Sequence, residues 1–440
     1  MRLKLTVAAP LRVGGREQRI NKLEYVLYRG KLHTVSPRKL AQLLLDNSER
    51  TLGDWNTEVL RLGQKADLTS FVRDKGLVDP ETIEQISRYS APCEHSNFNE
   101  FQPHARDGFG KLFIPGSAIK GAIRSAVMYE LVDEDRANRY VKTNRGGGRF
   151  YAGRLDKDIL QSYDLPNRDL KAGPHFDLLR AVKVADAYGE LNSRVEKITI
   201  QSYTEDGRGR TASLGANDKI FVECLTPGSW VEFDLKVDEK ILTDFESRNE
   251  GMPFEDEASL LQLVRNFYGD VWSRERGYYG VRQSGSVDSE PAKEPEKFPE
   301  LEEWIEREKG ILRGTLSKNV QKKFHRSQYN TARRDFEAGV GGTQQPSMTN
   351  PGVRDGALKV RKIKDFYGAT PASFRLGWGS GLLSTTVDMR LDDDNMGTVL
   401  NLINNNHNSG APIDGPKSRK LVGPENNPHS PMGWARLEVL

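Results

Sequence analysis

The sequence predicts an α+β fold, and three observations support this prediction. Short runs of alternating apolar residues, typical of half-buried strands, recur from Leu3–Val7 to about residues 431–439. Amphipathic stretches with helical spacing lie between them, at 37–45, 117–132 and 255–271. The length of 440 residues is enough for two domains with a sizeable core.

The composition is that of a polar protein from a reducing compartment. Hydrophobic residues make up 36% of the chain, and the mean hydropathy is −0.64. No apolar run approaches a membrane span, and the first residues alternate like a strand rather than a signal peptide, so we expect a cytoplasmic protein. Cys93 and Cys224 cannot form a disulfide framework. The 65 Lys and Arg residues are nearly balanced by 62 Asp and Glu, so the net charge is only +3. A nucleic-acid site therefore requires that the positive charges are gathered locally.

The first strand leads into a glycine pair flanked by arginines, Arg12-Val13-Gly14-Gly15-Arg16. Backbone amides and guanidinium groups in such a loop can hold a phosphate. The alternative is an ordinary turn.

A hairpin is expected over Tyr25–Val35, turning at Arg29-Gly30, and Ser36 then caps a helix over Pro37–Leu45. Residues 47–100 are predicted to be helical and polar. The one Cys/His cluster is Cys93, His95 and His104, and its C-x-H-x8-H spacing offers no obvious fourth ligand. We therefore expect neither a metal nor a cofactor.

The central stretch, 113–132, predicts a strand end at Leu112–Ile114, a turn at Pro115-Gly116 and a helix with Ser117 as its N-cap. Lys120 and Arg124 lie four residues apart and share a face of that helix. Free amides at a helix start, a glycine and two cations are suited to binding a phosphate. The alternative is that both cations are simply solvated.

A basic segment follows at 136–154, where arginines and aromatic residues surround the triplet Gly146–Gly148. Arg145 and Arg149 flank this triplet. Cations beside aromatic rings suit single-stranded RNA, although a mobile surface loop would have the same composition.

The remaining elements are assigned from their local patterns. We expect strands at 176–188 and 195–203, a second hairpin of 220–224 and 230–237, a linker at 283–299, a basic helical segment at 301–334, a Gly-rich loop at 338–350 and a strand around 360–366.

A second glycine-rich motif, Phe374–Leu383, follows a strand and carries Arg375, Gly377, Trp378, Gly379, Ser380 and Gly381. The G-x-G-x-G spacing lacks the further glycine and downstream acid of a dinucleotide fingerprint. A loop that closes over an RNA backbone fits better. The sequence holds no G-x-S-x-G elbow, Walker A motif or H-E-x-x-H motif.

Six of these stretches together resemble the RAMP superfamily, the RNA-binding proteins of CRISPR systems. They are PLRVGG at 10–15, IPGSAIKGAIRSA at 114–126, VKVADAY at 182–188, ECLTPGSWVEFDL at 223–235, FRLGWGSGLL at 374–383 and PMGW at 431–434. They occur in the family's order, and within the family they look like the subunits that cap the 3′ end of the guide RNA (crRNA) in type III-A (Csm-type) complexes.

This resemblance implies two ferredoxin-like (RRM-like) domains with large insertions. The first would cover 1–240, with insertions at about 47–100 and 136–175, and the second 241–440, with a helical part at about 255–334. It also implies a non-catalytic backbone subunit that binds the crRNA 3′ region and supports crRNA maturation in antiviral defence. Its partners would be crRNA, other RAMP backbone subunits, the small helical subunit and, indirectly, target RNA.

The residues expected near RNA combine these motifs with the basic segment. They are Arg12, Gly14, Gly15, Arg16, Gly116, Ser117, Lys120, Arg124, Arg145, Arg149, Arg375, Gly377, Trp378, Gly379, Ser380 and Gly381.

No catalytic residue is expected. The related target-cleaving subunit carries an aspartate in the loop after its first glycine pair, whereas the loop Gly15–Asn21 contains Glu17 and no Asp. Two alternatives stay open: a metal-independent ribonuclease that uses His33 or the His104 region, and the equivalent end subunit of a type III-B complex.

Overall fold

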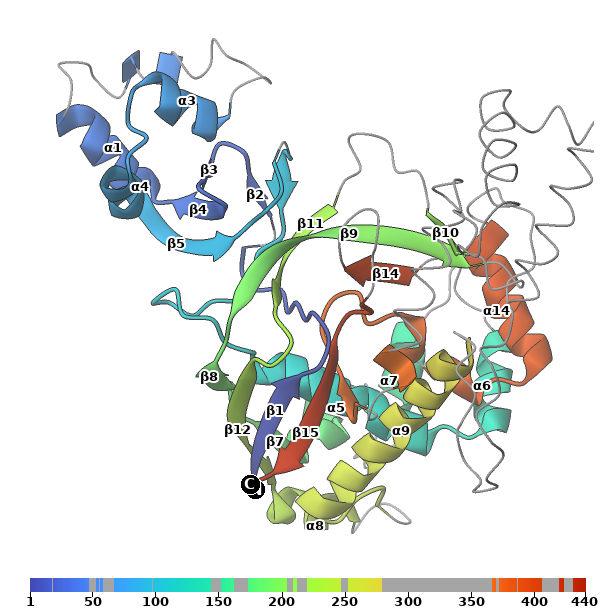
Figure 1. The fold of residues 1–440 in the computed structure, drawn as a ribbon. Coiled ribbons are helices and arrows are strands. Elements are labelled where there is room, and N and C mark those ends of the chain that lie inside the picture. Colours follow the sequence, from blue (N-terminus) through green and yellow to red (C-terminus); the bar gives the residue numbers. More distant parts are fainter. Residues whose placement is uncertain are drawn as a thin grey trace, which may run out of the picture.

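The computed structural model has an α+β fold built around a curled antiparallel sheet (Figure 1). It describes residues 1–17, 19–46, 53–54, 56–57, 67–96, 98–143, 152–161, 173–203, 209–211, 220–246, 252–278, 366–368, 372–385, 387–405, 419–422 and 430–440.

The central sheet joins the two ends of the chain. Its strand order is β13-β15-β1-β12-β7, with β8 also paired to β12. The strands are β1 (Arg2–Val7), β7 (Val182–Val184), β8 (Tyr188–Glu190), β12 (Trp230–Val237), β13 (Phe374–Arg375) and β15 (Trp434–Val439). Leu5 of β1 lies opposite Val231 on one side and Leu437 on the other. In Figure 1 the first and last strands therefore run side by side.

Two long helices, α5 (Gly116–Leu131) and α9 (Glu257–Tyr278), pack on each other within the largest core. The Tyr268 hydroxyl of α9 donates to the Ala122 carbonyl oxygen of α5 over 3.1 Å. Alternating burial of Leu3, Leu5 and Val7 places the inner face of β1 in the same core. The helices around this core are α6 (Glu134–Thr143), α7 (Ala152–Ile159), α8 (Glu239–Glu246) and α14 (Asp393–Asn405).

A second sheet has β9 (Ser193–Tyr203) at its centre. β9 pairs with β10 (Gly209–Thr211), β11 (Ile220–Leu225) and β14 (Arg419–Val422). Short 3-10 turns at Pro174–Phe176, Leu178–Ala181, Leu382–Ser384 and Asp388–Arg390 complete the regular structure near the core.

A smaller unit near the N-terminus has its own core. The three-stranded sheet of β3 (Tyr25–Tyr28), β4 (Lys31–Val35) and β5 (Ser87–Pro92) packs with α1 (Pro37–Asp46), α3 (Leu68–Asp74) and α4 (Pro80–Ile86). A separate two-stranded pair joins β2 (Ile20–Asn21) to β6 (Glu100–Phe101).

Elements specified by local patterns are confirmed. The Tyr25–Val35 hairpin turns at Arg29 (φ 47°) and Gly30 (φ 73°), the left-handed pair of a two-residue turn. β1, α1, β9 and β15 lie where they were predicted, and α9 runs seven residues beyond the predicted end at 271.

The predicted hairpin of 220–224 and 230–237 is wrong. β11 pairs with β9, and β12 pairs with β1, β7 and β8, so the two strands belong to different sheets. The turn between them is used for long-range contacts: Leu225 bridges Leu11, and the Gly228 amide donates to the Val7 carbonyl oxygen over 2.9 Å.

Four further predictions are corrected. Ser87–Pro92 is a strand inside the segment predicted to be helical, because it forms the third strand beside β4. Leu112–Ile114 makes two isolated bridges instead of a strand, and Leu178–Ala181 is a 3-10 turn. Phe366, expected on a strand, lies in a helical turn.

The predictions for 283–299, 301–334 and 338–350 fall outside the described residues, as do Gly146–Gly148 with Arg145 and Arg149. The division into ferredoxin-like domains at 1–240 and 241–440 stays a prediction. The pairing of β1 with β15 places strands from both ranges in one sheet. Among the described helices, none has the length and apolar character needed to cross a membrane.

Candidate RNA-binding surface

The structure brings together the two glycine motifs that lie furthest apart in the sequence. The Trp378 amide donates to the Arg12 carbonyl oxygen over 2.8 Å, and the Gly433 amide donates to the Pro10 carbonyl oxygen over 2.9 Å. The loop 12–16 and the loop 376–381, hereafter the loop pair, therefore form one continuous piece of surface.

The glycines of the second loop are required by conformation and by close packing. Gly377, Gly379 and Gly381 all have φ between 85° and 89°, a region that favours glycine. A Cβ on Gly377 would lie 2.3 Å from the Arg12 carbonyl oxygen, and one on Gly379 would lie 2.7 Å from the Met432 Sδ. The predicted loop is confirmed as a loop, and Gly377 allows its close contact with the loop 12–16.

Charges in the loop pair are divided between the interior and the surface. Arg12 is 6% exposed, and its Nε donates to the Pro103 carbonyl oxygen over 3.2 Å. Burial lowers the pKa of Arg12. Gly14, Gly15 and Arg16 are exposed. The loop pair therefore exposes its backbone at Gly14 and Gly15 and the Arg16 side chain to solvent.

Trp378 and Lys420 add an aromatic group and a cation to this surface. The half-buried Trp378 ring has the Lys420 Nζ 4.1 Å from its centroid and the Arg12 Cζ at 5.9 Å. Burial lowers the pKa of Lys420. No motif in the sequence indicates Lys420, since only the pairing of β14 with β9 brings it to this place.

His104 connects the loop pair to the entry of α5. Its Nδ1 accepts from the Val13 amide over 3.3 Å, and its Nε2 lies 3.1 Å from the Phe113 carbonyl oxygen. These partners require a neutral ring that carries its proton on Nε2. The ring is 3% exposed, and burial lowers the pKa of His104 to about 3.

A buried carboxylate lies beneath the same segment. Glu223 is 0% exposed and accepts hydrogen bonds from Arg106 Nη2 (2.5 Å), Ser193 Oγ (2.7 Å) and the His104 amide (3.0 Å). No local pattern in the sequence indicates this network, because its members are 30 to 119 residues from Glu223. It fixes the segment 103–106 that supports the loop pair.

The start of α5 differs from the prediction. The helix begins at Gly116 with Pro115 in the cap position, so Ser117 is an exposed helical residue rather than the N-cap. The Gly116 amide donates to the Asp186 Oδ1 over 2.8 Å. A Cβ on Gly116 would lie 2.4 Å from the Val184 carbonyl oxygen, so the glycine is required by the neighbouring strand.

The two cations of α5 have different surroundings. Arg124 donates to both carboxylate oxygens of Asp156 over 2.8 and 2.9 Å, and its Nη1 lies 2.8 Å from the Asp177 Oδ2. Arg124 thereby ties α7 and the turn at 178–181 to α5. Lys120 is half-buried, and burial lowers its pKa.

Two other residues expected near RNA lie in the interior. Arg375 is 3% exposed, pairs with Glu275 Oε1 over 2.6 Å, and donates from Nε to the Met432 carbonyl oxygen over 3.1 Å. Ser380 is 4% exposed. Their side chains do not lie on the surface of the loop pair.

The residues considered for catalysis have structural partners. Glu17 pairs with Arg88 over 2.8 Å, and the 6% exposed His33 has its Nδ1 3.2 Å from the Ser87 Oγ. In the part of the chain that the structure describes, no group of three metal-ligating side chains comes together.

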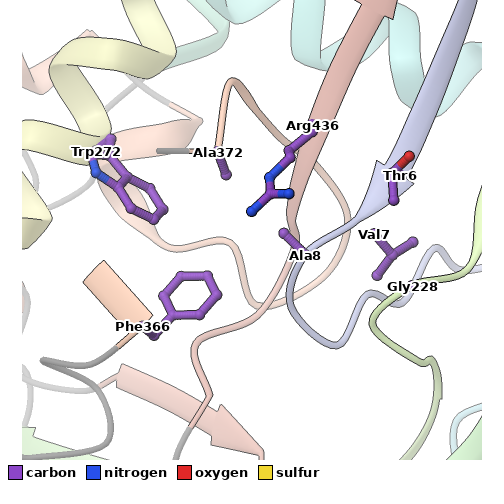
Figure 2. Close-up of a pocket in the computed structure, with 8 residues that line it drawn as sticks. All are labelled: Thr6, Val7, Ala8, Gly228, Trp272, Phe366, Ala372 and Arg436. Carbon is purple, nitrogen blue, oxygen red and sulfur yellow. The ribbon is translucent and has the colours of Figure 1, made fainter. Parts of the chain in front are cut away.

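A cavity of about 310 Å³ near the end of β1 is lined by eight residues, among which Arg436 is the only ionisable one (Figure 2).

The comparisons with known proteins concern the family and the fold of the chain. The family model described as the RAMP superfamily matches residues 4–318. A protein of Mycobacterium tuberculosis (strain CDC 1551 / Oshkosh), named CRISPR system Cms protein Csm5, is 27% identical over 142 residues, which cover 32% of this chain and 36% of that protein. A protein of the same name from Streptococcus thermophilus is 27% identical over 144 residues, which cover 33% of this chain and 36% of that protein. The match therefore spans about a third of the length of these curated relatives.

A solved structure shares the fold over the full length. A chain of the "Cryo-EM structure of Csm-crRNA-target RNA ternary complex in type III-A CRISPR-Cas system" superposes with a TM-score of 0.58, covering 100% of both chains at 19% identity.

Proposed function

Because the chain belongs to the RAMP superfamily, we propose that it is the backbone subunit that binds the 3′ region of the crRNA in a type III-A CRISPR complex. Its proposed partners are the crRNA, the neighbouring RAMP subunits, the small helical subunit and, through the crRNA, target RNA. In this role it supports crRNA maturation in antiviral defence. The names of the relatives, both called Csm5, support this assignment.

The observation that carries the proposal is the joining of the loop pair by the Trp378 to Arg12 hydrogen bond. It gathers exposed backbone at Gly14 and Gly15, the cations Arg16 and Lys420, and the Trp378 ring on one surface. Such a surface suits the phosphates, sugars and stacked bases of a single strand, with little dependence on base sequence.

We propose Lys120 of α5 as a further phosphate contact and give Arg124 and Arg375 internal roles. Arg124 and Arg375 are held by carboxylates, and a guanidinium bound in this way is less available to a phosphate. Gly116, Gly377 and Gly379 act through packing, because each allows a close backbone or side-chain approach. Ser117, which is exposed at the start of α5, stays in the proposed surface.

The test is the salt dependence of RNA binding by the variant Arg16→Ala/Lys120→Ala/Lys420→Ala. If all three cations contact phosphates, the slope of log K against log [salt] falls by about 2, since each lost contact to a single strand removes about 0.7. Affinity should fall by a similar factor for unrelated sequences. Fluorescence anisotropy with two labelled single-stranded RNAs measures both quantities.

The matched control is Lys240→Ala, which removes an exposed lysine from α8. It should leave the slope unchanged. An unaltered slope in the triple variant would reject the proposed surface.

A non-catalytic role is tested by incubating the purified chain with repeat-containing precursor RNA, with and without divalent metal. We expect a mobility shift without cleavage. Metal-dependent cutting that disappears in Glu17→Ala would instead assign the chain a nuclease activity.

A further inference from the structure

The loop Asp107–Lys111 presents an aromatic side chain entirely to solvent. Phe109 is 100% exposed, whereas the other exposed large apolar side chains among the described residues range from 38% to 60%. Gly108 and Gly110 flank it, and nothing lies within 4 Å of a Cβ built on either glycine. Both faces of the Phe109 ring are therefore open.

Full exposure of a single apolar side chain is common, but this loop is also rigid. The Asp107 Oδ1 accepts from the amides of Phe109 and Lys111, each over 2.9 Å. The Gly110 amide donates to the Asp107 carbonyl oxygen, and the Asp107 amide donates to the Lys111 carbonyl oxygen, each over 3.0 Å. Gly110 has a φ of 83°, which closes the turn.

The loop is also anchored to the protein interior. Arg106 Nη1 donates to the Gly110 carbonyl oxygen over 3.0 Å. The same guanidinium pairs with the fully buried Glu223 and lies 3.8 Å from the centroid of the Tyr89 ring. Phe109 is thus held out from the surface by contacts that extend into the core, so the loop itself would lose little conformational entropy when a partner binds it.

The charges around the loop are unfavourable for RNA. The Asp107 carboxylate accepts hydrogen bonds from the Phe109 and Lys111 amides. The Asp186 carboxylate, two residues before Tyr188, accepts one from the Gly116 amide. The Arg106 guanidinium is paired with Glu223. The second cation of 106–111 is Lys111, which is exposed and has its Nζ 5.5 Å from the Tyr188 ring centroid. Carboxylates beside an apolar tip repel phosphates, whereas they are tolerated at the rim of a protein interface.

An apolar surface continues next to the loop. The Phe113 and Tyr188 rings stack with centroids 5.5 Å apart and an interplanar angle of 15°. Tyr188 is 38% exposed. Aromatic residues clustered in this way around a protruding anchor are typical of the centre of a protein–protein contact.

We propose that Phe109 is a docking anchor that inserts into an apolar pocket of a neighbouring protein subunit in the assembly. The pocket should admit one phenyl ring and lack strong negative charge at its edge, because the Asp107 carboxylate lies in the same turn as Phe109. This inference rests on the proposed function, since it requires that the chain works inside a multi-subunit complex.

The test compares assembly with RNA binding. The chain is co-expressed with the other subunits of its complex and a crRNA, and the complex is purified through a tag on another subunit. Quantitative mass spectrometry then gives the amount of this chain per complex. Phe109→Ala should reduce that amount at least fivefold, and Phe109→Leu, which keeps an apolar side chain, should retain most of it.

Two controls accompany the variants. Leu23→Ala removes another exposed apolar side chain, 45% exposed and outside this loop, and should have no effect. The free Phe109→Ala chain should bind single-stranded RNA as tightly as the wild type does and melt at the same temperature.

The outcomes separate the alternatives. Unchanged incorporation of Phe109→Ala overturns the proposal. A loss of RNA affinity in the free Phe109→Ala chain also overturns the proposal and makes Phe109 a base-stacking residue. If the free wild-type chain self-associates and the variant does not, the pocket that receives Phe109 belongs to a second copy of this chain. If the wild-type chain binds RNA but does not enter the complex, this inference fails together with the proposed partners. If it enters the complex but does not bind RNA, only the proposed RNA-binding role fails.

Discussion

The loop pair and the start of α5 carry the same kinds of residues but use them differently. Both combine glycines with cations, and both were expected to bind phosphate. In the loop pair, Arg16 stays exposed and Lys420 lies over the Trp378 ring. At the start of α5, Arg124 is held by two carboxylates, and the first helical amide is taken by Asp186.

The comparison shows that a motif of glycines and cations can serve packing as well as binding. Gly377 and Gly116 are both required because a carbonyl oxygen lies where their Cβ would be. The difference between the regions lies in the acids that each one meets, and those acids come from distant parts of the chain.

Substitution of Gly377 should have the largest effect. Gly377→Ala combines a φ of 87° with a Cβ 2.3 Å from the Arg12 carbonyl oxygen, so the loop pair must separate. We expect a loss of about 3 kcal/mol in the free energy of unfolding, measured by urea denaturation. RNA affinity should fall in parallel.

Gly381→Ala is the matched control. Gly381 has nearly the same φ, 89°, but its Cβ would lie 4.0 Å from the nearest atom, the Glu275 Oε1. It should cost only about 1 kcal/mol, from backbone strain alone. Equal losses in the two variants would mean that the contact with Arg12 contributes nothing.

Acid should weaken the link that His104 makes between the two regions. Burial lowers the pKa of His104 to about 3, against an ordinary value of 6.5, so below pH 6.5 the unfolded chain binds a proton that the folded chain excludes. This contribution to stability is fully present above pH 6.5 and is lost as the pH falls. Between pH 7 and pH 5 we expect the free energy of unfolding to fall by about 2 kcal/mol from this group.

His104→Gln provides the comparison for the pH effect. Its amide can accept from Val13 and donate toward Phe113, but it does not titrate. The variant should be less stable at pH 7 and should show a flatter profile between pH 7 and pH 5. A profile parallel to that of the wild type would exclude His104 as the source of the acid sensitivity.

Arg124 and Lys120 should separate stability from binding. Arg124→Met leaves Asp156 and Asp177 without their cation and should lower the free energy of unfolding by about 1–2 kcal/mol. Lys120→Met should leave stability within about 0.5 kcal/mol and reduce RNA affinity several-fold at low salt. Urea denaturation and anisotropy on both variants measure the two effects. The reverse pattern would make Arg124 the phosphate ligand.

The elements that local patterns specify were predictable from the sequence. The alternation of Leu3, Leu5 and Val7, the Arg29-Gly30 turn and the apolar spacing of α9 depend on neighbours within a few residues. The glycine loop at 376–381 was predictable for the same reason, and its left-handed backbone suits glycine.

The pairing of distant segments was decided by the tertiary structure. The sequence around 220–237 does not distinguish a β11–β12 hairpin from two strands that belong to different sheets. The strands that decide between them are β9, which pairs with β11, and β1, which pairs with β12. The same applies to the site: Glu223, Arg375 and Arg124 look like surface charges until Arg106, Glu275, Asp156 and Asp177 are placed beside them.

The local sequence specified the glycine turns and the apolar faces of the elements, because backbone conformation and side-chain periodicity act over short range. Which cations stay unpaired depends on the folded chain, since a charge is neutralised by acids that come close in space from anywhere in the sequence. Arg16 and Arg124 share a residue type, and folding alone leaves the first exposed while it pairs the second with two carboxylates.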